Sequence, residues 1–329
     1  MHLPYNSVRQ VIDAGEVLYV LSDKGVYTFY LNSGAIEMLT KVDGFSESEV
    51  AAIAYSEAYE CLVIAYNNTN IDLLKGNSII NIPAIERANI VGVKRINAIT
   101  AYQQYVYFAT TFGVVVLDLE REEIIDDYQN LGANGTILEI QEIALHQDTI
   151  YLASEEGLKY APAFETSVNL KNFGSWTTRP ATTNTTHVIS YRDGLFYVSD
   201  SILYRLSDGL SAEVEAGTKQ DYRSLRVSQN QLVVVKREGI IALSNSGRKD
   251  YGNPFMDAAT LDFQENLWFG GFYTGLIKLD PANNYSYANP QGPFGITVYE
   301  MQGEGTRLWA TSGGHTSAYG PTYNSFGYY

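Results

Sequence analysis

The sequence predicts an all-β fold, a β-propeller made of four-stranded blades. The first observation is a short apolar run that recurs eight times along the 329 residues, and the second is its even spacing. Successive runs begin 44, 44, 44, 45, 37, 35 and 41 residues apart. Repeats of roughly 40 to 50 residues built from short strands are typical of propellers. The eight runs cover residues 18–22, 62–66, 106–110, 150–154, 195–199, 232–236, 267–271 and 308–312.

The composition fits a packed sheet protein. Hydrophobic residues make up 45% of the chain and charged residues 18%, which is typical of a globular body rather than a disordered one. Tyrosine is frequent, with 26 residues. Tyrosine suits half-buried strands because its ring packs while its hydroxyl reaches water.

Each module reads as four strands, and the first two are the most regular. The first strand mixes small and apolar residues, which suits the crowded axis of a propeller, and examples are residues 50–55, 96–102, 140–146 and 187–191. A polar hairpin turn follows, and then the recurrent apolar run forms the second strand. The next turn commonly carries a glycine, for which we expect a positive φ. These glycines are Gly25, Gly113, Gly157, Gly239 and Gly275.

The third and fourth strands complete each blade. Third strands follow the glycine directly, for example at residues 26–30, 114–118, 158–160, 240–243 and 276–280. The fourth strand is weaker and more polar, as at residues 36–39 and 124–128. This dilution is expected because the outer strands of a radial array face solvent.

The number of blades remains open between seven and eight. We favour a seven-bladed propeller over residues 1–292, with residues 1–5 as a closing outer strand. Residues 293–329 then form a linker and an incomplete eighth module that starts a second propeller. In the alternative, all eight modules close into one ring and the same amino-terminal strand completes the eighth blade.

Charge and segment patterns exclude several classes of protein. The formal charge of −15 disfavours nucleic-acid binding and broad adhesion to anionic membranes. No apolar stretch is long enough for a membrane helix, and the start of the chain does not resemble a signal peptide. We therefore expect an excised part of a longer protein. The single cysteine, Cys61, lies inside an apolar run and is predicted to be a small buried hydrophobe.

The sequence offers no catalytic or metal-binding motif. The four histidines, His2, His146, His187 and His315, fall at unrelated module positions. There is no zinc-protease motif, no phosphate-cradling glycine loop and no Cys/His ligand spacing. We therefore predict that the chain is not an enzyme and needs no metal or cofactor. A propeller hydrolase stays as an alternative, and it would require carboxylates facing one another across the channel.

Several stretches resemble known propeller families. Residues 266–271 (Asn-Leu-Trp-Phe-Gly-Gly) followed by residues 274–280 are similar to the two-component-regulator propeller repeat. More specifically, five stretches resemble the amino-terminal propeller of the PorZ family, which are surface components of the type IX secretion system. These stretches are residues 2–5, 44–56, 62–68, 70–74 and 112–118.

The resemblance implies a role and a location. In the PorZ family, two seven-bladed propellers precede a β-sandwich, and the protein takes part in delivering anionic lipopolysaccharide to exported proteins. The implied partners are a carbohydrate or lipopolysaccharide ligand, other secretion-system or envelope proteins, and further domains of the same chain. The implied location is the cell surface or the periplasm. The alternative is the periplasmic oligosaccharide-sensing propeller of a hybrid two-component regulator.

Ligands of propellers usually dock where one set of loops surrounds the channel mouth. We expect this mouth to display the loops between second and third strands and the links that lead into each first strand. Aromatic rings beside amides and charges suit sugars, and residues 86–95 hold the densest basic cluster. The predicted ligand-binding residues are Lys24, Asn67, Asn68, Lys94, Arg95, Phe112, Arg237, Phe272 and Tyr273.

Overall fold

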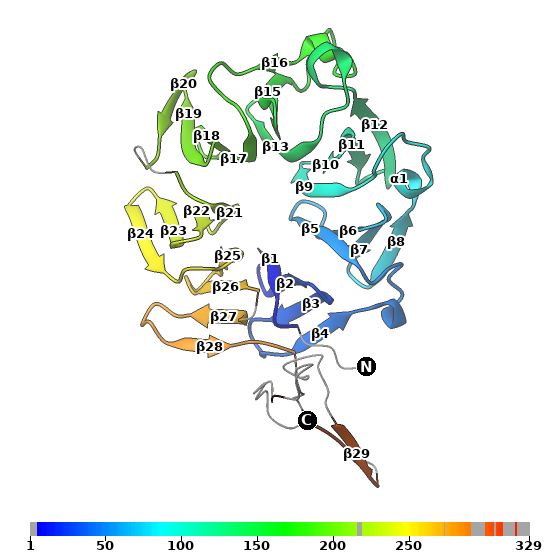
Figure 1. Ribbon diagram of the computed structural model, residues 1–329, viewed down its shortest axis with the longest axis vertical. Coiled ribbons are helices and arrows are strands. Elements are labelled where there is room, and N and C mark those ends of the chain that lie inside the picture. Colours follow the sequence, from blue (N-terminus) through cyan, green and yellow to red (C-terminus); the bar gives the residue numbers. More distant parts are fainter. Residues whose placement is uncertain are drawn as a thin grey trace.

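Seven sheets of four antiparallel strands stand around a common axis in the computed structural model (Figure 1). The structure describes residues 5–215, 219–272, 274–290, 300–305, 307–311 and 320. Each sheet is one continuous stretch of chain, and we number the blades 1 to 7 in chain order. The prediction of a seven-bladed propeller is confirmed.

The first two strands of each blade lie nearest the axis (Figure 1). The innermost strands are β1 (Val8–Asp13), β5 (Val50–Ser56), β9 (Ile96–Tyr102), β13 (Ile140–His146), β17 (Thr185–Tyr191), β21 (Tyr222–Ser228) and β25 (Ala258–Leu261). The second strands are β2 (Val17–Ser22), β6 (Cys61–Tyr66), β10 (Tyr105–Thr110), β14 (Thr149–Ser154), β18 (Gly194–Ser199), β22 (Gln231–Lys236) and β26 (Leu267–Gly271). The second strands carry the recurrent apolar runs, as predicted.

The third and fourth strands lie progressively further out. The third strands are β3 (Gly25–Tyr30), β7 (Ile71–Lys75), β11 (Gly113–Asp118), β15 (Gly157–Pro162), β19 (Ile202–Ser207), β23 (Gly239–Ser244) and β27 (Gly275–Leu279). The outer strands are β4 (Ile36–Leu39), β8 (Ser78–Ile82), β12 (Glu123–Gln129), β16 (Thr177–Thr178), β20 (Leu210–Glu213), β24 (Gly247–Gly252) and β28 (Tyr285–Tyr287). Strands β20 and β28 are fully exposed, in agreement with the predicted polar outer edge.

Helical structure among the described residues is limited to short connections. It consists of the single-turn helix α1 (Ala84–Arg87) and three 3₁₀ turns, η1 (Lys41–Asp43), η2 (Ala133–Gly135) and η3 (Phe173–Ser175). Only part of the predicted eighth module lies within the described residues. Its described part is a separate two-stranded sheet of β29 (Glu300–Glu304) and β30 (Arg307–Thr311), and β29 lies outside the ring in Figure 1.

The hydrophobic core is divided among the seams between blades. Seven clusters of buried side chains are found in the described residues, one for each pair of neighbouring blades. Each blade therefore buries both of its faces. This explains why the second strands are almost continuously apolar: every residue of β6 is buried, including Cys61, as predicted.

The ring closes between blades 7 and 1. Val8 and Val11 of β1 share a buried cluster with Trp268 of β26, whose ring centroid lies 5.0 Å from that of Phe29. The backbone amide of Gly275 donates a 2.7 Å hydrogen bond to the carbonyl of Asn6. Blade 7 takes its outer strand from β28. Residues 1–4 of the predicted closing strand lie outside the described residues.

The glycines after the second strands adopt the predicted backbone. All five predicted positions have positive φ, and Gly113 shows why the residue is required there. Its φ is +130°, and a Cβ at this position would lie 2.0 Å from the carbonyl oxygen of Tyr128 on β12. Glycine is needed both for the turn and for the close approach of β12.

Candidate functional site

An axial channel runs between the inner strands. It consists of two cavities of about 700 Å³ and about 610 Å³. The larger cavity is lined by residues at the hairpins between first and second strands, such as Asp13, Glu57 and Asn230, and we call its opening the hairpin mouth. The two cavities share five lining residues that we call the waist: Gln10, Ala98, Glu142, Leu225 and Arg226.

The smaller cavity is lined by a repeated backbone irregularity. In six of the seven inner strands, the pairing with the second strand skips one residue near the start of the strand. Such a β-bulge leaves one residue unpaired and redirects its side chain. The six bulged residues all line the smaller cavity, and we call its opening the bulge mouth. They are Arg9, Ala51, Asn97, Gln141, Thr186 and Arg223.

Arginines at the bulge mouth are held by acidic neighbours. Arg9 Nε lies 3.2 Å from Asp23 Oδ1, and Arg223 Nη2 lies 2.7 Å from Asp221 Oδ2. These pairs are partly exposed, and such pairs contribute only about 0–1 kcal/mol to stability. Their main effect is to orient the guanidinium groups at the rim.

A third arginine joins the rim through a network between blades 3 and 4. Arg95 donates from Nη2 to Glu139 Oε1 at 2.6 Å and from Nε to Asn97 Oδ1 at 2.9 Å. Asn97 in turn donates to the same Glu139 oxygen at 2.9 Å and to the carbonyl of Ile140 at 2.8 Å. The bulged Asn97 therefore fixes the position of Arg95.

Beside the waist, His187 forms a partly buried pair with the waist residue Glu142. His187 Nδ1 lies 3.3 Å from Glu142 Oε2, and its Nε2 lies 3.4 Å from the carbonyl oxygen of Tyr222. Both ring nitrogens face oxygen acceptors, which favours the doubly protonated ring. Burial alone lowers the pKa of His187, but the hydrogen bond and charge of Glu142 outweigh it, so the pKa is raised.

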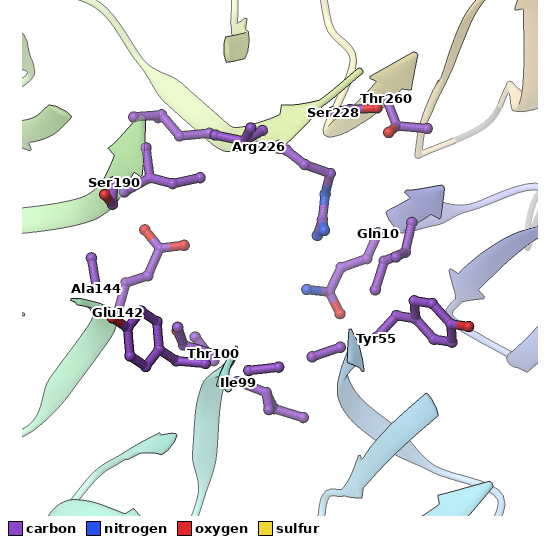
Figure 2. Close-up of a pocket in the computed structure, with 18 of the residues that line it drawn as sticks. Gln10, Tyr55, Ile99, Thr100, Glu142, Ala144, Ser190, Arg226, Ser228 and Thr260 are labelled. Atoms are coloured by element: carbon purple, nitrogen blue, oxygen red, sulfur yellow. The ribbon is translucent and has the colours of Figure 1, made fainter. Parts of the chain in front are cut away.

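The second charged side chain of the waist is Arg226 on β21. Figure 2 shows Arg226, Gln10 and Glu142 projecting into the channel from three different blades. Burial lowers the pKa of Arg226, and the charge of Glu142 partly opposes that shift. In the part of the chain that the structure describes, the guanidinium group of Arg226 has no hydrogen-bond acceptor and no ion-pair partner.

The two ends of the channel differ in charge. Beyond the waist, the bulge mouth carries Arg9, Arg95 and Arg223, and the hairpin mouth carries Asp13 and Glu57. Burial raises the pKa of Asp13, and a hydrogen bond from Gln229 opposes the shift. An anion approaching the axis therefore meets guanidinium donors at the bulge mouth, each already paired with a carboxylate, and carboxylates at the hairpin mouth.

The structure brings some of the predicted binding residues to the channel. Asn67 and Arg95 line the bulge mouth. Lys24 is exposed in the turn between β2 and β3. Asn68 is exposed and donates to Glu86 at 3.3 Å, away from the two cavities.

Two predicted binding residues have structural roles instead. Phe112 is only 2% exposed and belongs to the buried cluster between blades 2 and 3, so its ring cannot stack on a sugar. The ammonium group of Lys94 donates to the carbonyls of Ile85, Glu86 and Ala88 at the end of α1. In this structure Phe112 therefore faces the seam between blades 2 and 3, and the ammonium group of Lys94 faces the carbonyls at the end of α1.

The remaining predicted residues lie near blades 6 and 7. The guanidinium carbon of Arg237 stands 5.7 Å from the ring centroid of Phe255, which is 67% exposed. Phe272 is 57% exposed in the turn between β26 and β27. Tyr273 lies outside the described residues. Neither Arg237 nor Phe272 lines the two channel cavities.

The sequence analysis missed five charged or amide residues that line the channel cavities, namely Arg9, Gln10, Glu142, Arg223 and Arg226. The signal was present as charged or amide side chains inside otherwise small and apolar inner strands. Within the described ranges there is no group of three or more His, Cys, Asp or Glu residues placed to hold a metal ion. No helix of the described part is long and apolar enough to cross a membrane.

Comparison with known proteins supports the resemblance seen in the sequence. Residues 18–177, just under half of the chain, match the family described as "TSS9, PorZ, N-terminal beta-propeller domain". The solved structure of PorZ from Porphyromonas gingivalis, described as an essential bacterial surface component of the type IX secretion system, is similar with a TM-score of 0.77 and 20% identity. That alignment covers 95% of this chain and 43% of the PorZ chain. No curated protein sequence matches significantly.

Two extracellular propellers of B. thetaiotaomicron share the fold. One belongs to a putative hybrid two-component system, with a TM-score of 0.63 and 14% identity over 95% of this chain and 46% of that one. The other belongs to a putative one-component system, with a TM-score of 0.59 and 12% identity over 93% of this chain and 50% of that one. This chain thus spans half or less of each of these structures.

Proposed function

We propose that this chain, which matches the PorZ N-terminal propeller over residues 18–177, is a non-catalytic binding and scaffold propeller of a bacterial cell-envelope protein. Its role would be PorZ-like, in type IX secretion and in the delivery of anionic lipopolysaccharide. The family match and the fold shared with PorZ support this assignment. The envelope location and the presence of further domains follow from the same likeness.

The observation that carries the proposal is the arginine rim of the bulge mouth. The whole chain has a formal charge of −15, so an anionic glycolipid requires a local basic surface. Arg9, Arg95 and Arg223 provide guanidinium donors at the opening of a channel, where the paired carboxylates of Asp23, Glu139 and Asp221 fix their positions. Guanidinium groups suit phosphate and carboxylate groups because of their forked geometry.

A non-catalytic role fits the groups at the waist. Glycoside hydrolysis commonly uses two carboxyl groups on either side of the scissile bond. Among the described residues shared by the two cavities, Glu142 is the one carboxylate, and it is engaged by His187 and by the backbone amide of Val188. Mass spectrometry of acidic oligosaccharides incubated with the protein is expected to show no product, and turnover would contradict this part of the proposal.

A second candidate function is the oligosaccharide-sensing propeller of a two-component regulator. It is favoured by the fold shared with the extracellular domains from B. thetaiotaomicron. The two candidates differ in their ligands: a sensor would bind a free oligosaccharide, whereas the PorZ-like role requires binding of anionic lipopolysaccharide.

The test is binding of purified anionic lipopolysaccharide, measured by biolayer interferometry. We expect the wild-type chain to bind lipopolysaccharide. The R95A/R223A variant is expected to bind at least about tenfold more weakly, because each substitution removes a guanidinium group that would donate charged hydrogen bonds to the ligand. The matched control is R121A/R205A, which removes two exposed arginines that do not line the channel cavities. Equal binding by all three proteins would place the ligand elsewhere. Binding only of free neutral oligosaccharides would favour the sensor.

A further inference from the structure

The guanidinium group of Arg226 stands in the channel and has no acceptor among the described residues. Arg226 lies on the inner strand β21, is partly buried, and lines both cavities. Its five N–H donors make no hydrogen bond within the described residues. A charged group that leaves bulk water normally gains a counter-charge or acceptors, because its desolvation is costly. Arg226 therefore lacks the partner that its position calls for.

A second donor that has no acceptor among the described residues faces the same space. The side-chain oxygen of Gln10 accepts a 2.8 Å hydrogen bond from the backbone amide of Ile53. Because that backbone group can only donate, the oxygen of Gln10 is fixed toward blade 2 and its amide nitrogen is directed away. In Figure 2 this nitrogen faces the open channel, on the side from which Arg226 approaches.

The charges at the waist leave a net positive charge. His187 faces oxygen acceptors with both ring nitrogens, Glu142 Oε2 at 3.3 Å and the carbonyl oxygen of Tyr222 at 3.4 Å, which suits the protonated ring paired with Glu142. The backbone amide of Val188 also donates to Glu142 at 2.9 Å. The positive charge of His187 balances the negative charge of Glu142, so the positive charge of Arg226 remains. This single charge suits a ligand with one negative charge rather than two.

We propose that the waist of the channel binds a carboxylate group, with Arg226 as its main contact and the amide nitrogen of Gln10 as a second donor. The ligand class is a monoanionic, carboxylate-bearing sugar, because hydroxyl groups can pair with the polar lining of the channel. The arginines of the bulge mouth provide the approach, and Asp13 and Glu57 disfavour entry from the hairpin mouth. This inference rests on the proposed glycan-binding role of the same channel.

The experiment is isothermal titration calorimetry at pH 6 and low salt with D-glucuronate, and with D-glucose as the uncharged probe. We expect the wild-type chain to bind glucuronate and to bind glucose much more weakly. The R226Q variant is expected to lose about tenfold or more in glucuronate affinity, the typical effect of removing a hydrogen bond to a charged group. The matched control R121Q removes an exposed arginine of the β11–β12 turn and is expected to bind like the wild type.

Equal affinity of wild type and R226Q for glucuronate, or no glucuronate binding by the wild type, would overturn the site. If R226Q does not fold, R226K retains the charge but loses the forked geometry, and it is expected to bind more weakly than wild type. Lipopolysaccharide binding by the same proteins separates the two proposals. Glucuronate binding that depends on Arg226 in a chain that binds no lipopolysaccharide supports the carboxylate site and contradicts the PorZ-like function. Lipopolysaccharide binding without glucuronate binding supports the PorZ-like function and contradicts the carboxylate site.

Discussion

His187 on β17 reaches across the seam between blades 4 and 5 to Glu142 on β13, with 3.3 Å between Nδ1 and Oε2. The same carboxylate oxygen accepts the backbone amide of Val188, so two groups of blade 5 converge on one side chain of blade 4. The pair therefore joins two blades at the waist of the channel and also sets the local charge.

The first prediction concerns the pH dependence of stability. Because the pKa of His187 is raised in the folded state, its contribution is fully present below the unfolded pKa of about 6.5 and is lost as the pH rises through the folded pKa. The contribution of His146 to the pH dependence of stability has the opposite sign, because burial lowers the pKa of His146. We therefore expect the difference in unfolding free energy between wild type and H187Q to shrink from pH 5 to pH 8. Urea unfolding at each pH measures it, and a constant difference would contradict the assignment.

The second prediction is that Phe112 stabilises the protein and does not bind ligand. Its ring is buried between blades 2 and 3, so F112A is expected to cost about 3–5 kcal/mol of unfolding free energy. F272A alters a ring that is 57% exposed and is expected to cost less than about 1 kcal/mol. Chemical denaturation measures both variants. A small effect of F112A together with a loss of glycan binding would restore Phe112 as a ligand contact.

The third prediction concerns the turn between β10 and β11. G113A places a Cβ 2.0 Å from the carbonyl oxygen of Tyr128 at a φ of +130°, and we expect a cost of about 3 kcal/mol or more. The control is G76A, where φ is +56° and no atom lies within 4 Å of the added Cβ. The control is expected to lose only about 1 kcal/mol, the strain of a left-handed alanine. Thermal unfolding of the two variants provides the comparison, and similar melting temperatures would speak against the close approach of β12.

The fourth prediction separates the cap of α1 from the binding surface. K94M removes three hydrogen bonds to the carbonyls of Ile85, Glu86 and Ala88 and is expected to cost about 1–2 kcal/mol. The control K41M removes an exposed ion pair with Glu47 and is expected to cost less than about 1 kcal/mol. Ligand affinity of K94M is expected to equal that of the wild type. A selective loss of affinity without loss of stability would show that Lys94 contacts the ligand.

The candidate site was predictable only in part. The loops around the channel mouth could be identified from the repeat, and Asn67 and Arg95 do line it. Phe112 was misplaced because an aromatic residue beside a turn glycine looks exposed in sequence, whereas the turn directs it into the seam. The side chains at the waist were missed because a polar residue on an inner strand could face either the channel or a neighbouring blade.

The sequence alone determined the sheet architecture. The spacing of apolar runs and turn glycines is a local property, and it can be read without knowing which residues are in contact in the folded protein. The tertiary structure decided which side chains reach the axis. Each bulge adds one residue to an inner strand, which reverses the side-chain alternation at that point and turns residues such as Arg9 and Arg223 toward the opening. Ring closure then places Gln10, Glu142 and Arg226 around one waist, although more than eighty residues separate each from the next along the chain.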